Sequence, residues 1–274
     1  MGTMGIIDKL FHQRQKDGGI KLKRTIAITN QKGGVGKSTT AVNMSAYLSS
    51  YGYKTLLIDL DPQSNSTSGI GIGSGDVENS TYDVLINNMD PHEAIINTIY
   101  KNLDLLPSSI QLAGAEVELV SSIKREYRLS EAVKKVEEEY DYIIIDCPPA
   151  LGLLTINALS AAREVIIPIQ CEYYALEGLG QLLNTIDLVK KNLNEDLKIS
   201  GAIMTMYDSR TKLSEQVIDE VKNYFEEKVY KTIIPRNIRL SEAPSYGKAI
   251  MDYDPECRGA KAYKDFTKEV IDND

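Results

Sequence analysis

Short apolar runs alternate along the chain with longer segments in which apolar residues recur at helical spacing. This alternation is typical of helices packed on both faces of a mostly parallel β-sheet. The expected strands are 24–30, 54–60, 103–106, 141–146, 165–170, 199–206 and 229–234. The expected helices are about 37–51, 111–121, 128–140, 152–162, 175–193, 212–226 and 257–272. We therefore expect a single α/β domain, residues 24–274, around a twisted sheet of about seven to eight strands.

The segment 64–75 (SNSTSGIGIGSG) interrupts this alternation with serine and glycine. Its glycines do not fit the dinucleotide-binding pattern GxGxxG, and no strand directly precedes them. We interpret the segment as a mobile loop that follows the second strand.

An N-terminal extension, residues 1–23, stands apart from the domain. Four apolar residues recur there at helical spacing (Ile6, Ile7, Leu10 and Phe11), and residues 9–24 hold six Lys and Arg against one Asp. A short basic amphipathic helix of this kind would suit a membrane, a partner protein or DNA. We favour the alternative of a disordered tail, because chain ends are commonly unstructured.

Composition narrows the classes of function. The chain of 274 residues is 42% hydrophobic and 26% charged, and 31 basic against 39 acidic residues give a net charge of −8. These values are ordinary for a soluble globular protein, and a net negative chain is not an obvious binder of nucleic acid. No apolar run approaches the roughly 18 residues that a membrane span requires, and no signal sequence is present, so we expect a cytosolic protein.

Cysteine and histidine are scarce. Cys147, Cys171 and Cys257 lack the spacing of a disulfide framework, a zinc site or an iron–sulfur cluster. Only two histidines occur, His12 and His92, which suit surface or capping positions and nearly exclude a histidine triad.

The strongest chemical motif follows the first expected strand and reads Lys32-Gly33-Gly34-Val35-Gly36-Lys37-Ser38-Thr39. Glycines let successive backbone N–H groups surround an anion, and the N-terminus of the next helix adds partial positive charge. In such a polyphosphate cradle Lys37 reaches the β- and γ-phosphates, Ser38 gives its hydroxyl to Mg²⁺, and Thr39 contacts the α-phosphate side. The common pattern GxxxxGK[ST] requires glycine where Gln31 stands, so this loop is a variant with a second lysine, Lys32.

Three aspartates close two of the expected strands. Asp59 and Asp61 end the strand 54–60, and Asp146 ends the strand 141–146. Ligands of open α/β sheets bind beyond the carboxyl ends of the strands, which places these carboxylates near the phosphates. Carboxylates there can hold Mg²⁺ or orient an attacking water.

These residues resemble the ParA/Soj family of chromosome- and plasmid-partition ATPases, within the deviant Walker A group of P-loop proteins. The resemblance covers about 24–270 and is closest to Soj-like members. Besides KGGVGKST at 32–39 it rests on LDPQ at 60–63, YIIIDCPP at 142–149, LLTINAL at 153–159, IPIQCEYYALEG at 167–178 and IPRNIRLSEAPSYGKAI at 234–250.

The resemblance implies a homodimer that sandwiches ATP and Mg²⁺, with Lys32 of one subunit reaching the phosphates bound by the other. By position, Lys37 is the phosphate lysine, Ser38 and Asp146 serve Mg²⁺, and Asp61 orients the hydrolytic water. By the same resemblance, Pro235 and Asn237 are expected to contact the adenine base. Asp59 is expected to support the residues that contact the nucleotide and the metal, without contacting either itself.

Sequence-independent DNA binding is also implied, together with a ParB-like centromere-binding partner that stimulates slow hydrolysis and a nucleoid location. Residues 228–248 hold Lys228, Lys231, Arg236, Arg239 and Lys248 against Glu242, a net charge of 5 − 1 = +4. By resemblance, Arg210 and Arg239 contact the DNA backbone; Arg236 either joins them or serves the nucleotide.

Two other functions stay open. One is a nucleotide-gated switch that controls a replication initiator with little turnover. The other is a MinD-like membrane ATPase, which the acidic end of the chain disfavours because anionic lipid repels it.

Overall fold

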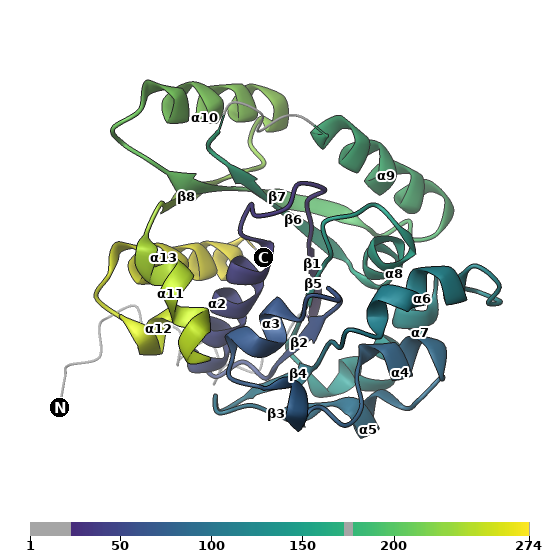
Figure 1. The fold of residues 1–274 in the computed structure, drawn as a ribbon. Coiled ribbons are helices and arrows are strands. Elements are labelled where there is room, and N and C mark those ends of the chain that lie inside the picture. Colours follow the sequence, from purple (N-terminus) through teal and green to yellow (C-terminus); the bar gives the residue numbers. More distant parts are fainter. Residues whose placement is uncertain (1–22, 173–177, 274) are drawn as a thin grey trace, which may run out of the picture.

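The computed structural model describes residues 23–172 and 178–273, and its centre is one eight-stranded sheet (Figure 1). The strand order is β3-β4-β2-β5-β1-β6-β7-β8, and every neighbouring pair is parallel except β3 with β4. The strands are β1 (Arg24–Ile28), β2 (Thr55–Asp59), β3 (Ile96–Asn97), β4 (Leu103–Leu106), β5 (Tyr142–Asp146), β6 (Glu164–Gln170), β7 (Lys198–Tyr207) and β8 (Val229–Pro235). This confirms the predicted α/β fold.

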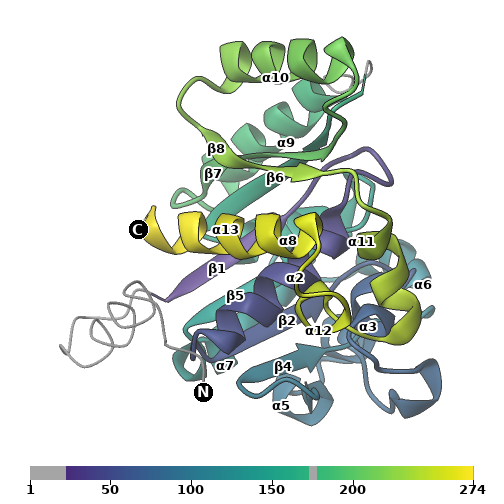
Figure 2. The same cartoon turned by 90° about the vertical axis from the view of Figure 1, so that its left-hand side faces the viewer.

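Helices cover both faces of the sheet, because the central strands are apolar on both sides. Ile26 and Ile28 of β1 belong to one hydrophobic core, whereas Ala27 between them belongs to the other. The first core lies under α2 and α13, which Figure 2 shows side by side; the second lies under α7 to α10. The longer helices are α2 (Lys37–Ser50), α6 (Leu112–Leu119), α7 (Arg128–Val136), α8 (Leu153–Ala161), α9 (Leu179–Asn192), α10 (Lys212–Phe225) and α13 (Arg258–Asp272).

The prediction for residues 64–75 was wrong. The segment contains the helix α3 (Asn65–Gly69) and the 3₁₀ turn η1 (Ser74–Asp76), and Ser66 and Thr67 are buried. Further short elements that carry no clear sequence period are α4 (Thr81–Ile86), α5 (Pro91–Ala94), η2 (Glu137–Glu139), α11 (Ile238–Glu242), η3 (Ala243–Tyr246) and α12 (Ile250–Tyr253).

Two earlier predictions fall on residues that the structure does not describe. The proposed helix or tail at 1–23 lies almost wholly outside the described residues, as does the expected start of a helix at 175. Within the described ranges, no helix is both long enough and apolar enough to span a bilayer.

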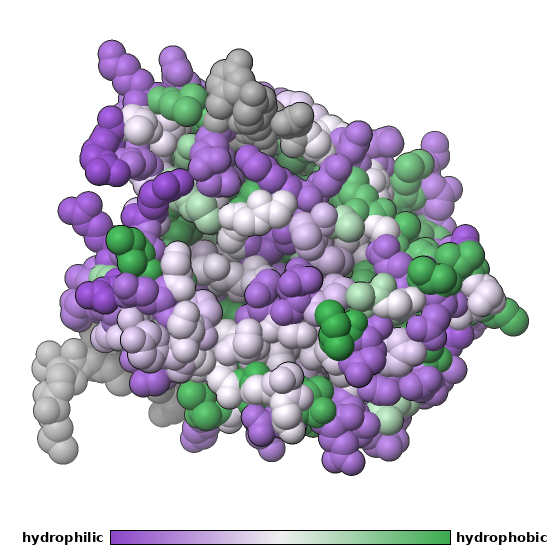
Figure 3. Space-filling view, viewed as in Figure 1, coloured by the Kyte–Doolittle hydropathy of each residue, from purple (hydrophilic) through white to green (hydrophobic). Residues whose placement is uncertain are grey.

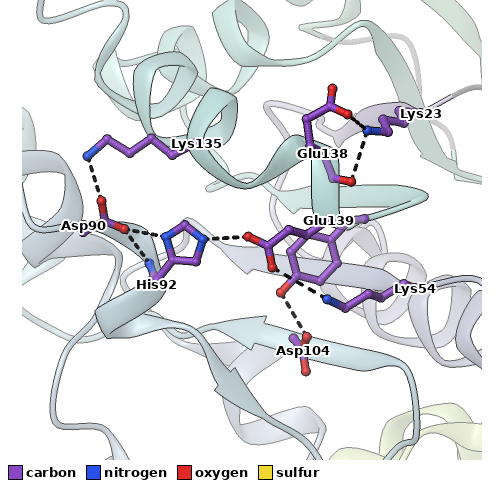
Figure 4. Close-up of polar contacts among 9 residues, drawn as sticks. Lys23, Lys54, Asp90, His92, Asp104, Lys135, Glu138 and Glu139 are labelled. Carbon is purple, nitrogen blue, oxygen red and sulfur yellow. Dashed lines mark hydrogen bonds and ion pairs between the residues drawn. The ribbon is translucent and has the colours of Figure 1, made fainter.

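A polar network closes the edge of the sheet where β2 and β5 begin (Figure 4). The His92 ring bridges Asp90, at 2.6 Å, and Glu139, at 2.7 Å, and these carboxylates raise the pKa of the imidazole. Lys135 pairs with Asp90 at 3.1 Å. His92 thus lies at the surface, as expected, and ties α5 to η2.

A buried ion pair joins β1 to β6 and α13. The guanidinium of Arg24 donates to Glu164 through two nitrogens, at 2.8 and 2.7 Å, and to the carbonyl of Val270 at 2.6 Å. Both side chains are nearly fully buried. Burial opposes ionisation of Glu164, yet Arg24 holds the pKa of this carboxyl below its usual value.

Glu164→Gln should lower the free energy of unfolding by about 3–5 kcal/mol, because it leaves the Arg24 charge buried without compensation. Urea denaturation measures the loss. Lys198→Gln is the matched control, since Lys198 is exposed and lies 3.9 Å from the same carboxylate, and it should change stability by less than about 0.5 kcal/mol. Equal losses in the two variants would contradict this account.

Candidate nucleotide-binding site

Sheet register brings the strand-end aspartates together. β5 lies between β1 and β2, and Asp146 is in register with Ile28 on one side and Asp59 on the other. The carboxyl ends of these three strands therefore meet at one edge, which faces the viewer in Figure 1. The loop 29–36 leaves β1 at this edge and enters α2.

The loop has the backbone of an anion cradle. Gly34 and Gly36 have φ of 74° and 91°, in the left-handed region that favours glycine, and Gly36 directly precedes α2. Neighbouring strands hold the loop in place, because Thr205 of β7 donates to the carbonyl of Val35 at 2.9 Å. Asn30 adds a second tie by donating to the carbonyl of Pro168 at 2.7 Å. These hydrogen bonds from β6 and β7 fix the conformation of the loop.

The two loop lysines differ in their surroundings. Lys37 is 6% exposed, and its Nζ donates to the carbonyl of Lys32 at 3.1 Å. Burial lowers the pKa of Lys37, while the charges of Asp146 and Asp61 oppose this shift. Lys32 is half-buried, and its ammonium has no hydrogen-bond or ion-pair partner among the described residues.

Asp146 is fully buried and only half satisfied. Its Oδ2 accepts from the Ser66 hydroxyl at 2.7 Å, whereas its Oδ1 has no hydrogen-bond partner within residues 23–172 and 178–273. Burial raises the pKa of Asp146 to about 6, and the hydroxyls of Ser66 and Ser38 act in the opposite direction.

Asp59 is fully buried and has its oxygens occupied. Its Oδ2 accepts from the amide and hydroxyl of Thr67, at 2.8 and 2.7 Å, and its Oδ1 accepts from the amide of Asp61 at 3.1 Å. Burial, followed by the charge of Asp146, raises the pKa of Asp59. These bonds suit a supporting position rather than a ligand.

The residues fit a magnesium ion that arrives with a nucleotide. The Ser38 hydroxyl lies near the Asp146 carboxyl group, and hydroxyl and carboxylate oxygens are ligands of the kind Mg²⁺ prefers. Within the described part of the chain, no three His, Cys, Asp or Glu side chains gather into a metal site. Mg²⁺ commonly takes only one or two protein ligands, and phosphates or waters complete its coordination.

Two adjoining cavities open at this edge. One, of about 290 Å³, is lined by the loop, Asp61, α3 and Lys248; the other, of about 450 Å³, is lined by residues 234–238 and Tyr263. Gly36, Thr39, Met206 and Pro244 line both. A polyphosphate in the first cavity would thus continue into a base in the second. The second contains Pro235 and Asn237, the residues expected at adenine, together with Arg236.

Sequence reasoning missed the wall that α3 forms. Asn65, Ser68 and Gly69 line the first cavity. Beyond α3, Gly71 lies against Gly247 so closely that a Cβ on Gly247 would stand 2.6 Å from the Cα of Gly71. Both glycines have positive φ. The glycine-rich composition therefore serves a close backbone contact.

The three candidate DNA-binding arginines lie beyond the same edge of the sheet. Arg210 follows β7, and Arg236 and Arg239 follow β8, whose ends are paired through Tyr207 and Pro235. Each arginine is exposed and has a carboxylate partner. The ion pairs are Arg210–Asp208 at 2.6 Å, Arg236–Glu172 at 3.2 Å, and Arg239 with Glu242 at 2.8 Å and Asp254 at 3.3 Å.

The basic run 228–248 does not form one surface. Lys228 precedes β8 and Lys231 lies early in it, whereas Arg236, Arg239 and Lys248 follow its far end. Since a strand of this length separates the two ends by roughly 20 Å, only the second group is near the candidate nucleotide site.

Known proteins resemble this chain over most of its length. Residues 23–199 match the model of a family described as AAA domain (AAA_31). The sporulation initiation inhibitor protein Soj of Bacillus subtilis is 61% identical, with 91% of this chain and 99% of that protein covered. The chromosome partitioning protein ParA of Myxococcus xanthus is 50% identical, with 97% and 94% covered. A crystal structure of cobyrinic acid a,c-diamide synthase from Mycobacterium smegmatis, with bound ATP analog and magnesium, is 40% identical with a TM-score of 0.81 and covers 91% of this chain and 95% of that one.

The glycine-rich loop between a buried parallel strand and a helix places the molecule among the P-loop ATPases. Its second loop lysine and its likeness to the curated relatives narrow this class. The chain belongs to the Soj/ParA family of chromosome-partitioning ATPases, as its motifs indicated.

Gly247→Ala should weaken nucleotide binding and lower the free energy of unfolding by about 1–3 kcal/mol. The new Cβ would meet the backbone of Gly71, and φ of 62° strains any residue other than glycine. Gly75→Ala is the matched control, because nothing lies within 4 Å of its Cβ. Thermal unfolding and titration with an ATP analogue measure both effects, and identical behaviour of the two variants would show that the Gly71–Gly247 contact does not hold the cavity wall.

Proposed function

We propose that this protein is a DNA-partition ATPase that dimerises around ATP, binds DNA without sequence preference in that state, and hydrolyses ATP slowly. A ParB-like centromere-binding partner would stimulate hydrolysis and release, and the site of action would be the nucleoid in the cytoplasm. The observation that carries this proposal is a glycine-rich loop before α2 with one buried lysine, Lys37, and a second lysine, Lys32, whose ammonium has no partner among the described residues.

ATP is proposed to occupy the two adjoining cavities. The amides of residues 33–36 and Lys37 would hold the phosphates, Thr39 would contact the α-phosphate side, and the segment of Pro235 and Asn237 would hold adenine. Ser38 and the free oxygen of Asp146 would hold Mg²⁺. The ion would supply charge neutralisation on the β- and γ-phosphates.

Asp61 is proposed to orient the attacking water. It lines the phosphate cavity, and its Oδ1 accepts from the amide of Gln63 at 2.9 Å, which restrains the carboxylate. Ser108 donates to the Asp61 carbonyl at 2.7 Å and fixes the backbone as well. Positioning of this kind, rather than covalent chemistry, is what phosphoryl transfer to water requires.

Lys32 is proposed to act across the dimer. It does not line the phosphate cavity of its own subunit, whereas Lys37 does. The face that a second copy would cover also carries exposed aliphatic residues, which gather around α6 and the turns before and after it (Figure 3). These are Ile110, Val117, Val120 and Ile123, which are 58–84% exposed. Such a patch favours burial in an interface.

Lys32→Ala should retain ATP and fail to dimerise, because the cradle amides and Lys37 stay in place while the cross-subunit ammonium is lost. Sedimentation velocity with a non-hydrolysable ATP analogue measures the dimer, and calorimetry measures nucleotide affinity. Lys101→Ala, on an exposed residue outside both cavities, is the control. A nucleotide-dependent dimer of the Lys32 variant would remove this lysine from the proposed role.

DNA is proposed to bind along the arginines beyond β7 and β8. Their acidic partners balance their charge in the free monomer, which agrees with weak binding by a single subunit of net charge −8. Dimerisation doubles the number of phosphate contacts, so affinity should rise steeply with ATP and fall steeply with salt.

Arg239→Glu should abolish ATP-dependent binding of a non-specific duplex, because a phosphate contact in each subunit becomes a repulsion. Fluorescence anisotropy with ATP, with ADP and without nucleotide, across a salt series, measures it. Arg163→Glu is the matched control: its side chain is 59% exposed, against 53% for Arg239, and it lies at the opposite edge of the sheet. Unaltered binding by the Arg239 variant would refute the surface.

Two alternatives differ in what they predict. A regulatory switch acting on a replication initiator would need bound nucleotide but little turnover. The Bacillus subtilis relative is named a sporulation initiation inhibitor, which favours a regulatory role without indicating its target. Membrane attachment through the last helix is disfavoured, because the apolar face of α13, including Tyr263 and Phe266, is buried in the core.

A further inference from the structure

Ser66 occupies an unusual position for a serine in a glycine- and serine-rich segment. It lies in α3 and is fully buried. Its hydroxyl donates to Asp146 Oδ2 at 2.7 Å, across 80 residues of sequence. No other side-chain hydrogen bond of Ser66 occurs in the part of the chain that the structure describes.

This hydrogen bond makes the two oxygens of Asp146 unequal. Oδ2 accepts a hydrogen bond from Ser66, while Oδ1 is also buried and has no partner in the part of the chain that the structure describes. A carboxylate with one oxygen fixed cannot rotate freely about its last bond. The free oxygen is therefore held in one direction before any ion arrives, as second hydrogen-bonding partners of metal ligands commonly do.

Helix α3 donates hydrogen bonds to both buried aspartates, to Asp146 from Ser66 and to Asp59 from Thr67. Thr67 donates twice to Asp59 Oδ2, and Asn65 and Ser68 of the same helix line the phosphate cavity. Ser66 thus fixes a carboxylate from the inner side of a helix whose outer side forms the cavity wall. A hydroxyl that only filled space in the core would not need an acceptor of this charge.

We propose that Ser66 is a positioning residue for magnesium, which holds Asp146 Oδ2 so that Oδ1 is left for the ion that accompanies the nucleotide. The inference rests on the proposed function, because it takes Asp146 as a magnesium ligand.

The test is the magnesium requirement of nucleotide binding by the full chain. Calorimetry measures ATP affinity at a series of Mg²⁺ concentrations and in excess EDTA. Ser66→Ala should raise the Mg²⁺ concentration for half-maximal tightening by about 10-fold, and it should leave the affinity in EDTA unchanged. Ser66→Cys, which keeps the volume and offers only a weak donor, should raise the requirement as well and serves if the alanine variant does not fold.

Ser50→Ala is the matched control, because Ser50 is exposed and lies outside both cavities, and within the described part of the chain its side chain donates to one backbone carbonyl, that of Tyr47 at 2.7 Å. It should keep the wild-type requirement. An unchanged Mg²⁺ requirement in both Ser66 variants would overturn the proposal, and so would an equal loss of affinity with and without Mg²⁺, which indicates a purely structural role. Absence of ATP binding by the wild-type protein would instead overturn the proposed function.

Discussion

The site depends on one consequence of parallel strand pairing: two carboxylates, Asp59 and Asp146, end in register on adjacent strands and are both withdrawn from water. Like charges in a buried environment repel strongly, and each acid resists ionisation there. The structure offsets this with hydroxyl and amide donors from α3 and with the ammonium of Lys37. One oxygen, Asp146 Oδ1, is left without compensation. A divalent cation that arrives with the nucleotide would compensate the charge on this oxygen.

The sequence predicted the elements whose structural role produces a recognisable residue pattern. The buried strands are continuous apolar runs, as parallel strands covered on both faces must be, and the loop at 32–39 combines glycines with lysines in a way that few structural needs explain. The prediction of a loop at 64–75 was wrong because polar residues in this segment serve buried hydrogen bonds and are not there for contact with water. Ser66 and Thr67 are buried among carboxylates rather than solvated, and composition alone does not distinguish the two situations. β3 was missed for another reason, since two residues carry no period.

Charge illustrates the same limit. The excess of basic residues in 228–248 is real, yet β8 separates its members into two groups, because a strand carries the chain from one edge of the sheet to the other. Arg210 is far from Arg239 in sequence, and both follow the same end of the sheet only because β7 and β8 end side by side. Their ion pairs with neighbouring carboxylates could not be read from the sequence either. Adenine contacts at Pro235 and Asn237 were likewise expected from family likeness and not from any local pattern.

The contacts of α3 connect the proposed magnesium and nucleotide site to the segment that carries the proposed DNA-binding Arg239. At one end, Ser66 binds the carboxylate proposed to hold the metal; just beyond the other end, Gly71 lies against Gly247. Gly247 follows η3, which continues directly from α11, the helix that carries Arg239. Each link is a buried hydrogen bond or a backbone contact with no side chain between, and close-packed elements of this kind transmit a displacement instead of absorbing it. A rearrangement of oxygens around the phosphates would therefore reach the arginine-bearing segment through one short helix, and the absence of a Cβ at Gly71 and Gly247 is what keeps that path short.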